Sequence, residues 1–261
     1  TGTLDPLATG VLPVLLGTYT KLADILVEGE KEYIASAKFG LSTDTLDITG
    51  KITEGIDKES LLCKTISYQE LSDILNTFQG DIKQIPPMYS ALKKDGKRLY
   101  ELARQGIEIE REPRDITIFD IKLQKYDFPE FTIKVRCSKG TYIRSLIRDI
   151  GEKLNIPIVM TDLVRTLTGG FTLDDAVNMA DIDTFDKRSR IIKADTIFCE
   201  YPKLTADDKF SKLLINGVKM KDPALVNGIK AEGMLRLYDN KDEFLGLAEF
   251  KNGELNLKYR V

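Results

Sequence analysis

The chain has 261 residues, 42% of them hydrophobic, which is enough for one large domain or two of modest size. Its longest apolar runs are far shorter than the roughly 20 residues that cross a bilayer, and no basic-then-apolar signal segment opens it. We therefore expect a soluble, cytoplasmic protein without membrane contact. Histidine is absent, which excludes Ser-His and Cys-His nucleophile activation from the printed residues. The three cysteines are scattered, so we expect reduced core residues rather than a zinc site or disulfides.

Basic charge is concentrated in one part of a chain whose net charge is −3. Lys93 to Arg148 contains 14 Lys or Arg and 9 Asp or Glu, a balance of +5, so the remaining residues carry −8. Within this part, Lys94, Lys97 and Arg98 stand close to tyrosines. The pattern fits a solvated helix face, and it also fits a surface that follows phosphates and stacks on bases.

The first 80 residues predict alternating strands and helices. TGTLDPLATG, at 1–10, is a turn around an Asp-Pro step, and the apolar run 11–16 predicts a buried strand. Residues 20–29 predict a short helix that ends at a glycine. Strict alternation over 33–41 predicts a strand with one apolar face, and helical spacing predicts a helix over 68–80.

The clearest element runs from Phe131 to Leu154, where the hydrophobic period changes at Gly140 from two to about 3.6. This change predicts a strand, a glycine turn and a helix. Tyr142 and Arg144 fall at the start of that helix, where free backbone N–H groups favour an anion. An ordinary surface arginine is the alternative interpretation.

The composition and hydrophobic pattern of the sequence change near residue 186. A charged stretch at 187–195 predicts a linker, and short strand-like pieces separated by Asp, Asn, Lys and Gly follow it. We therefore expect a small all-β appendage at the C-terminal end.

Four stretches occur in a fixed order: GTLDPLATGVLPVLLG, KEYIASAKFG, PPMYSALKKDGKRLYELARQG and CSKGTYIRSLIRDIG. Together they resemble the bacterial TruB-type tRNA pseudouridine synthases, over most of residues 1–171 and more weakly to the end. The resemblance implies an α+β fold, in which helices flank a mixed, largely antiparallel sheet with a central catalytic cleft. It implies a synthase domain at 1–198, with an RNA-binding insertion at about 86–115, and a PUA-like domain at 199–261.

The same resemblance implies an isomerase that converts uridine 55 in the T loop of tRNA to pseudouridine after base flipping, without cofactor or metal. The implied partner is the T-arm stem-loop of tRNA, bound by a monomer without guide RNA. Because the family has a histidine and a strand before the position of Thr1, we expect this chain to be part of a longer protein.

Motif matching assigns the implied catalytic roles to Asp5 as nucleophile, to Tyr33, and to Arg144 as the partner of Asp5. It assigns the uracil pocket to Tyr142, Leu163 and Asp47, and further substrate binding to Lys93, Lys94, Lys97 and Arg98. The sequence does not choose between attack by Asp5 at C1′ of the ribose and attack at C6 of the ring.

Physical chemistry gives each catalytic residue a task. A carboxylate can form a covalent adduct and later depart. In a pocket that excludes water its pKa would rise, and the guanidinium of Arg144 opposes that rise. Tyr33 can stack on uracil and bring its hydroxyl near the proton to be removed, although a tyrosine with a pKa near 10 is a weak base.

Three other functions fit parts of the sequence. A guide-RNA-dependent synthase shares the catalytic motifs, but the insertion favours the stand-alone form. A non-catalytic tRNA-binding or tRNA-folding module would keep the basic segment and have no use for Asp5 and Arg144 together. A hydrolase built on Asp44 and Asp47 is also conceivable, although TDTLDITG has the composition of a turn.

Overall fold

A computed structural model describes residues 2–183 and 191–261, and the described chain divides into two compact units. The larger unit comprises 2–13 and 27–176, and the smaller one comprises 14–26 and the described residues from 177 onward. The linker predicted at 187–195 lies partly outside the described residues. Among those that are described, no helix is both long and apolar enough to cross a membrane.

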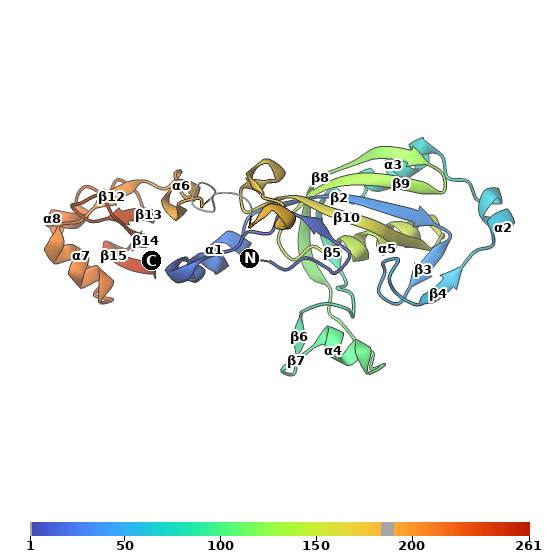
Figure 1. The fold of residues 1–261 in the computed structure, drawn as a ribbon, viewed down its shortest axis with the longest axis horizontal. Coiled ribbons are helices and arrows are strands. Elements are labelled where there is room, and N and C mark those ends of the chain that lie inside the picture. The colour runs from blue at the N-terminus through green and yellow to red at the C-terminus, as the bar shows by residue number, and fades with distance from the viewer. Residues whose placement is uncertain (1, 184–190) are drawn as a thin grey trace. The chain divides into compact units, whose positions relative to one another are not determined.

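The larger unit is built on a seven-stranded sheet in the order β1-β10-β2-β9-β8-β5, with β11 paired to β10 (Figure 1). Only β1 and β10 run parallel, and every other pair is antiparallel. The predicted mixed, largely antiparallel sheet is therefore confirmed. The strands are β1 (Thr9–Gly10), β2 (Lys31–Phe39), β5 (Gly80–Gln84), β8 (Arg114–Asp127), β9 (Glu130–Cys137), β10 (Ile158–Thr168) and β11 (Phe171–Thr172).

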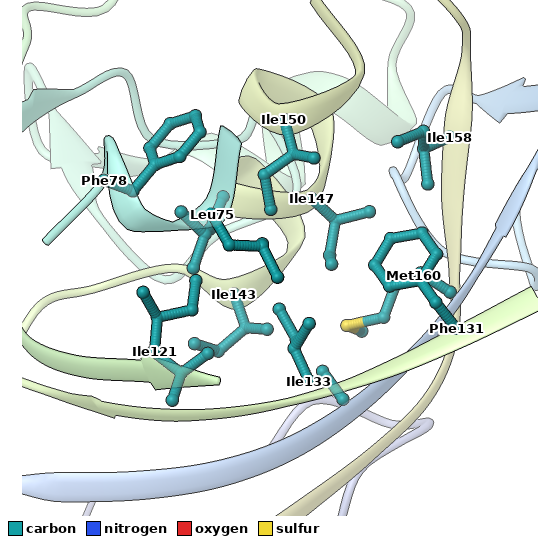
Figure 2. Close-up of a cluster of buried hydrophobic side chains, with 14 of the residues drawn as sticks. Leu75, Phe78, Ile121, Phe131, Ile133, Ile143, Ile147, Ile150, Ile158 and Met160 are labelled. Atoms are coloured by element: carbon teal, nitrogen blue, oxygen red, sulfur yellow. The ribbon is translucent and has the colours of Figure 1, made fainter. Parts of the chain in front are cut away.

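Two helices cover one face of this sheet. α3 (Tyr68–Asn76) packs over β8, and α5 (Ile143–Leu154) packs over β10 and β2. Figure 2 shows the core between them, where side chains of α5 such as Ile147 and Ile150 meet sheet residues such as Ile133 and Met160. The strand, turn and helix predicted over 131–154 are confirmed, because the apolar period of each element matches the surface it buries.

Alternation along β2 explains how the sheet builds this core. Tyr33, Ala35, Ala37 and Phe39 are buried, whereas the residues between them are half-buried on the opposite face. The small alanines allow α5 to approach the middle of the strand, and Tyr33 stands nearer its start. The strand predicted over this stretch is confirmed.

The apolar run at 11–16 is not a strand, which corrects the prediction made from the sequence. Only Val11 is buried, whereas Leu12, Val14 and Leu16 are 47%, 73% and 57% exposed. Parallel pairing with β10 ends at Gly10, and Pro13 has no N–H group to continue a ladder.

The connections of the larger unit carry small elements of their own. A short hairpin, β6 and β7, and the helix that follows it project together away from the main sheet (Figure 1). These elements are β3 (Leu41–Thr43), β4 (Ile52–Gly55), α2 (Lys58–Cys63), β6 (Lys93–Lys94), β7 (Lys97–Arg98), α4 (Leu99–Arg104) and η2 (Leu173–Asp175).

The smaller unit contains a four-stranded sheet in the order β12-β13-β14-β15, which confirms a C-terminal β region. Helices accompany this sheet, a feature that an all-β appendage did not anticipate. Phe210 and Leu214 of α7 pack on Leu237 and Leu255 of the sheet. The elements are η1 (Gly17–Leu22), α1 (Ala23–Val27), η3 (Met179–Asp181), α6 (Ala194–Ile197), β12 (Lys203–Thr205), α7 (Asp208–Ile215), α8 (Pro223–Val226), β13 (Gly233–Tyr238), β14 (Phe244–Lys251) and β15 (Glu254–Arg260).

Candidate active site

A bidentate ion pair joins Arg144 at the start of α5 to Asp5 in the loop before β1. Nε and Nη2 of Arg144 donate to the two carboxylate oxygens of Asp5 at 2.7 and 2.8 Å. The side chain of Arg144 is 5% exposed and that of Asp5 is 31% exposed. The side chain of Arg144 is therefore enclosed by protein groups, whereas the carboxylate of Asp5 can still be reached from solvent.

The other donors of Arg144 are bound to main-chain oxygens. Nη1 donates to the carbonyl of Thr45 at 3.0 Å, and Nη2 donates to the carbonyl of Tyr89 at 2.9 Å. Four of the five N–H groups of this guanidinium are thus used in these two bonds and the pair with Asp5. A guanidinium held in this way has one orientation, so it fixes the plane of the carboxylate as well.

The start of α5 is held in place by a glutamine from the end of β5. The side chain of Gln84, which is buried, accepts from the N–H of Tyr142 at 2.8 Å and donates to the carbonyl of Tyr142 at 3.1 Å. One turn further, Ser145 donates to the carbonyl of Ile85 at 2.9 Å. These bonds set the direction in which Arg144 leaves the helix.

Asp47 lies on the other side of Arg144, with 3.9 Å between its Oδ2 and Nη1. Its Oδ1 accepts bonds from the Thr45 hydroxyl and from the N–H and hydroxyl of Thr49. Asp47 is 4% exposed, and these bonds explain how a carboxylate is tolerated there. Its charge adds to that of Asp5, so the three groups carry one net negative charge.

The loop that carries Asp5 is held by close backbone contacts. The N–H of Ala8 donates to the carbonyl of Asp5 at 2.9 Å, which closes a turn. Gly10 has φ of +106°, and a Cβ there would lie 2.2 Å from the carbonyl oxygen of Arg165. Only glycine fits where β1 meets β10, so the loop leaves the sheet in a defined direction.

Tyr33 and Tyr142 lie close enough to Asp5 for its charge to raise the pKa of both. Burial is the main cause in each case, and it raises the pKa of Tyr33 to about 12. Leu163 is buried on β10 and belongs to the same hydrophobic cluster as Tyr33. Tyr33, Tyr142 and Asp47 thus lie near the Asp5–Arg144 pair, and Leu163 lies in the adjoining core; their assignment to a uracil pocket stays a prediction.

The four basic residues Lys93, Lys94, Lys97 and Arg98 are not part of this cluster. They lie exposed on the β6–β7 hairpin. Arg98 donates to the hydroxyl of Tyr100 at 3.0 Å, and both Arg98 and Arg104 lie over the Tyr100 ring. The hairpin is nevertheless linked to the site, because Tyr89, whose carbonyl binds Arg144, lies just before it.

Sequence reasoning missed several residues that build the site. Gln84 and Arg165 act through buried side chains, and Thr45 and Tyr89 act through carbonyl oxygens. A main-chain contact leaves no signal in residue type. The only hint at Gln84 and Arg165 is a long polar side chain inside a strand. Among residues 2–183 and 191–261, no group of three or more Cys, Asp or Glu side chains is placed to hold a metal ion.

Comparison with known proteins gives a consistent match. The model of the TruB family pseudouridylate synthase (N terminal domain) matches residues 1–143. The tRNA pseudouridine synthase B of Clostridium tetani is 47% identical over 249 residues, which cover 95% of this chain and 84% of that protein. The enzyme of the same name from Clostridium novyi is 45% identical over 247 residues, covering 95% and 83%.

A solved structure, the crystal structure of a Cbf5-Nop10-Gar1 complex, is similar over 95% of this chain and 68% of the matched chain. Its TM-score is 0.62 and its sequence identity 23%. At that identity the similarity shows a shared fold.

The raised pKa of Tyr33 predicts a specific sensitivity to alkali. A folded-state pKa near 12, against about 10 when unfolded, stabilises the fold below pH 10, and this contribution is lost as the pH rises toward 12. Between pH 10 and 12 the free energy of unfolding should fall by about 2–3 kcal/mol more in wild type than in Tyr33→Phe. Urea unfolding at several pH values measures this, with pH 8 as the baseline. Equal pH dependence in the two proteins would contradict the assignment.

Proposed function

The chain belongs to the TruB family of pseudouridylate synthases, and from this membership we propose that it converts uridine 55 in the T loop of tRNA to pseudouridine. Its relatives at 40–47% identity carry the name tRNA pseudouridine synthase B, which supports tRNA as the substrate. The observation that carries the proposal is the bidentate Asp5–Arg144 pair beside Tyr33.

The reaction moves uracil without adding or removing atoms overall. The bond between N1 and C1′ of the ribose breaks, the base rotates, and a bond from C5 to C1′ forms. The proton on C5 is lost, and N1 gains one. Asp5 supplies the nucleophile, whose bond to the substrate, at C1′ or at C6, forms early and breaks before product leaves. The partly exposed carboxylate of Asp5 is suited to this task.

Arg144 orients the nucleophile. Two N–H···O bonds from a fixed guanidinium hold both oxygens of the Asp5 carboxylate, and charge-assisted bidentate pairs of this kind are strong and directional. Because Asp47 is satisfied by Thr45 and Thr49, it leaves the fork of Arg144 to Asp5. Asp47 therefore supports the pair without competing for it.

Tyr33, Tyr142 and Leu163 form the uracil pocket in this proposal. A flipped base needs an aromatic platform and a shaped apolar wall, and Tyr33 and Leu163 provide these from adjacent strands β2 and β10. The phenol of Tyr33 keeps its proton at neutral pH, since burial raises its pKa. Stacking is thus its first role. Proton removal from C5 is its second, and it requires the phenolate, which forms when the phenol proton passes to water and becomes the phenol again on taking the C5 proton.

Binding of the rest of the tRNA is assigned to exposed parts of the chain. We assign 1–198 to the synthase domain, with an RNA-binding insertion at about 86–115 that grips the T arm, and 199–261 to a PUA-like domain. The proposed enzyme works in the cytoplasm as a monomer without guide RNA. The exposed basic hairpin with its Arg-stacked tyrosine supports an RNA-contacting insertion.

A guide-dependent synthase is the second candidate, since chains of similar fold occur in a Cbf5-Nop10-Gar1 complex. The 40–47% identity to enzymes named for tRNA favours the stand-alone form. Incubating purified protein with an unmodified T-arm stem-loop and mapping pseudouridine decides between them. Conversion without any guide RNA supports the proposal, and conversion only with a guide refutes it.

Replacement of the nucleophile should separate chemistry from binding. Asp5→Asn is nearly isosteric but not nucleophilic, so product should be abolished while the Kd for tRNA changes by no more than about threefold. Asp44→Asn is the matched control, because Asp44 is exposed and its carboxylate accepts from the N–H of Lys51. This control should keep wild-type activity. Substantial product from Asp5→Asn would remove Asp5 from the mechanism.

Neutralising the basic hairpin should weaken binding more than chemistry. With Lys93, Lys94, Lys97 and Arg98 changed to Gln, the slope of log K against log salt should flatten by up to about 3, since fewer counterions are released. The rate at saturating tRNA should survive. Four exposed lysines outside the hairpin serve as the equal-charge control: Lys58, Lys64, Lys122 and Lys125. An unchanged slope in the hairpin variant would mean that these four side chains are solvated and do not contact tRNA phosphates.

Two substitutions separate the roles of Tyr33. Tyr33→Phe keeps the aromatic face and removes the hydroxyl, so single-turnover conversion at saturating tRNA should fall by roughly 10² while binding barely changes. Tyr33→Ala should in addition lose stacking worth about 1–3 kcal/mol. Activity should therefore decrease in the order Tyr, Phe, Ala. A Tyr33→Phe rate equal to wild type would leave Tyr33 as a platform only.

A further inference from the structure

Arg165 is the largest side chain that is fully buried in the described chain, with 1% exposure. Its charge is satisfied by main-chain oxygens on both sides of Asp5. Nε donates to the carbonyl of Val11 at 2.8 Å, and Nη2 donates to the carbonyl of Gly2 at 3.0 Å. One guanidinium thus holds the two ends of the loop that carries the proposed nucleophile.

The backbone of Arg165 holds the same loop. Its carbonyl accepts from the N–H of Val11 at 2.9 Å, and Gly10 packs directly against it. The parallel β1–β10 pairing aligns Gly10 with Arg165. Side chain and main chain therefore act together, so the loop has little freedom to move relative to β10.

On its other side, Arg165 faces Tyr33. The two residues are partners across the β10–β2 ladder, and the register shifts immediately after Arg165, a feature that re-aims side chains. Burial raises the pKa of the Tyr33 phenol, and the nearby charge of the Arg165 guanidinium partly opposes this rise.

We propose that Arg165 is a positioning residue that fixes the phenol oxygen of Tyr33 relative to the carboxylate of Asp5. The inference rests on the proposed function. Because Arg165 is 1% exposed, it does not touch the uridine and acts through its two neighbours. Arg165 binds both ends of the Asp5 loop and lies opposite Tyr33 in the β10–β2 ladder, so it can fix the distance between the two side chains. Its charge also favours the phenolate form of Tyr33.

A purely structural clamp is the competing interpretation, and a double-mutant cycle separates the two. The cycle comprises wild type, Arg165→Lys, Tyr33→Phe and the double variant, each measured for single-turnover conversion at saturating unmodified tRNA. Melting temperature and the Kd for tRNA are measured alongside. Arg165→Gln provides a second, uncharged arm, and Arg136→Lys, an exposed arginine on β9, is the control that should match wild type.

Arg165→Lys should lower the rate about tenfold when Tyr33 is present, and less than about twofold in the Tyr33→Phe protein, as coupled neighbours do. The Kd for tRNA should change by no more than about threefold. If Arg165 only clamps the loop, Arg165→Lys would lower the rate by the same factor in the wild-type and the Tyr33→Phe protein. That result, or no loss of rate at all, overturns the inference. Failure of both Arg165 variants to fold would assign the residue to the fold alone and also overturn it. Absence of product from wild type would instead refute the proposed function.

Discussion

The structure of the larger unit depends on satisfying one buried guanidinium. Arg144 is 5% exposed, and breaking such a pair by removing one partner costs about 3–5 kcal/mol because the other charge is left uncompensated. Its partners come from three separate stretches of chain, around Asp5, Thr45 and Tyr89. A loop, a turn and the segment before the basic hairpin must therefore all be in place before the arginine is satisfied. The same condition aligns the carboxylate of Asp5.

The site is built at the edge of the hydrophobic core rather than on separate loops. Tyr33 and Leu163 belong to the core cluster that Ile147 and Met160 fill. Because such cores are close-packed, these two side chains cannot shift without disturbing the sheet and α5. In the proposed function, a flipped base would therefore meet a rigid wall, and adaptation to RNA would fall to exposed elements such as the β6–β7 hairpin.

The sequence predicted those elements in which one apolar period is unbroken. The strand and helix over 131–154 could be placed because the period changes at one glycine. The run at 11–16 misled because apolar composition does not show whether a pairing partner exists beyond Gly10. The meeting of Asp5 with Arg144, 139 positions apart, came from family resemblance and not from any local pattern. Main-chain contacts at Thr45 and Tyr89 had no signal at all, since any residue supplies a carbonyl.

Arg144 and Arg165 lie beside Asp5 and Tyr33, two groups that the proposed mechanism uses in opposite protonation states. The proposed mechanism uses Asp5 as an anion, and Arg144 donates two direct bonds to the oxygens of its carboxylate. Tyr33 is neutral at pH 7, because burial together with the charge of Asp5 raises the pKa of its phenol. The phenolate, which is the form that accepts a proton, is therefore scarce at neutral pH, and the charge of Arg165 partly opposes this rise in pKa. An arginine beside each group thus fits the proposed roles, in which Asp5 acts as a carboxylate and Tyr33 rests as a neutral phenol.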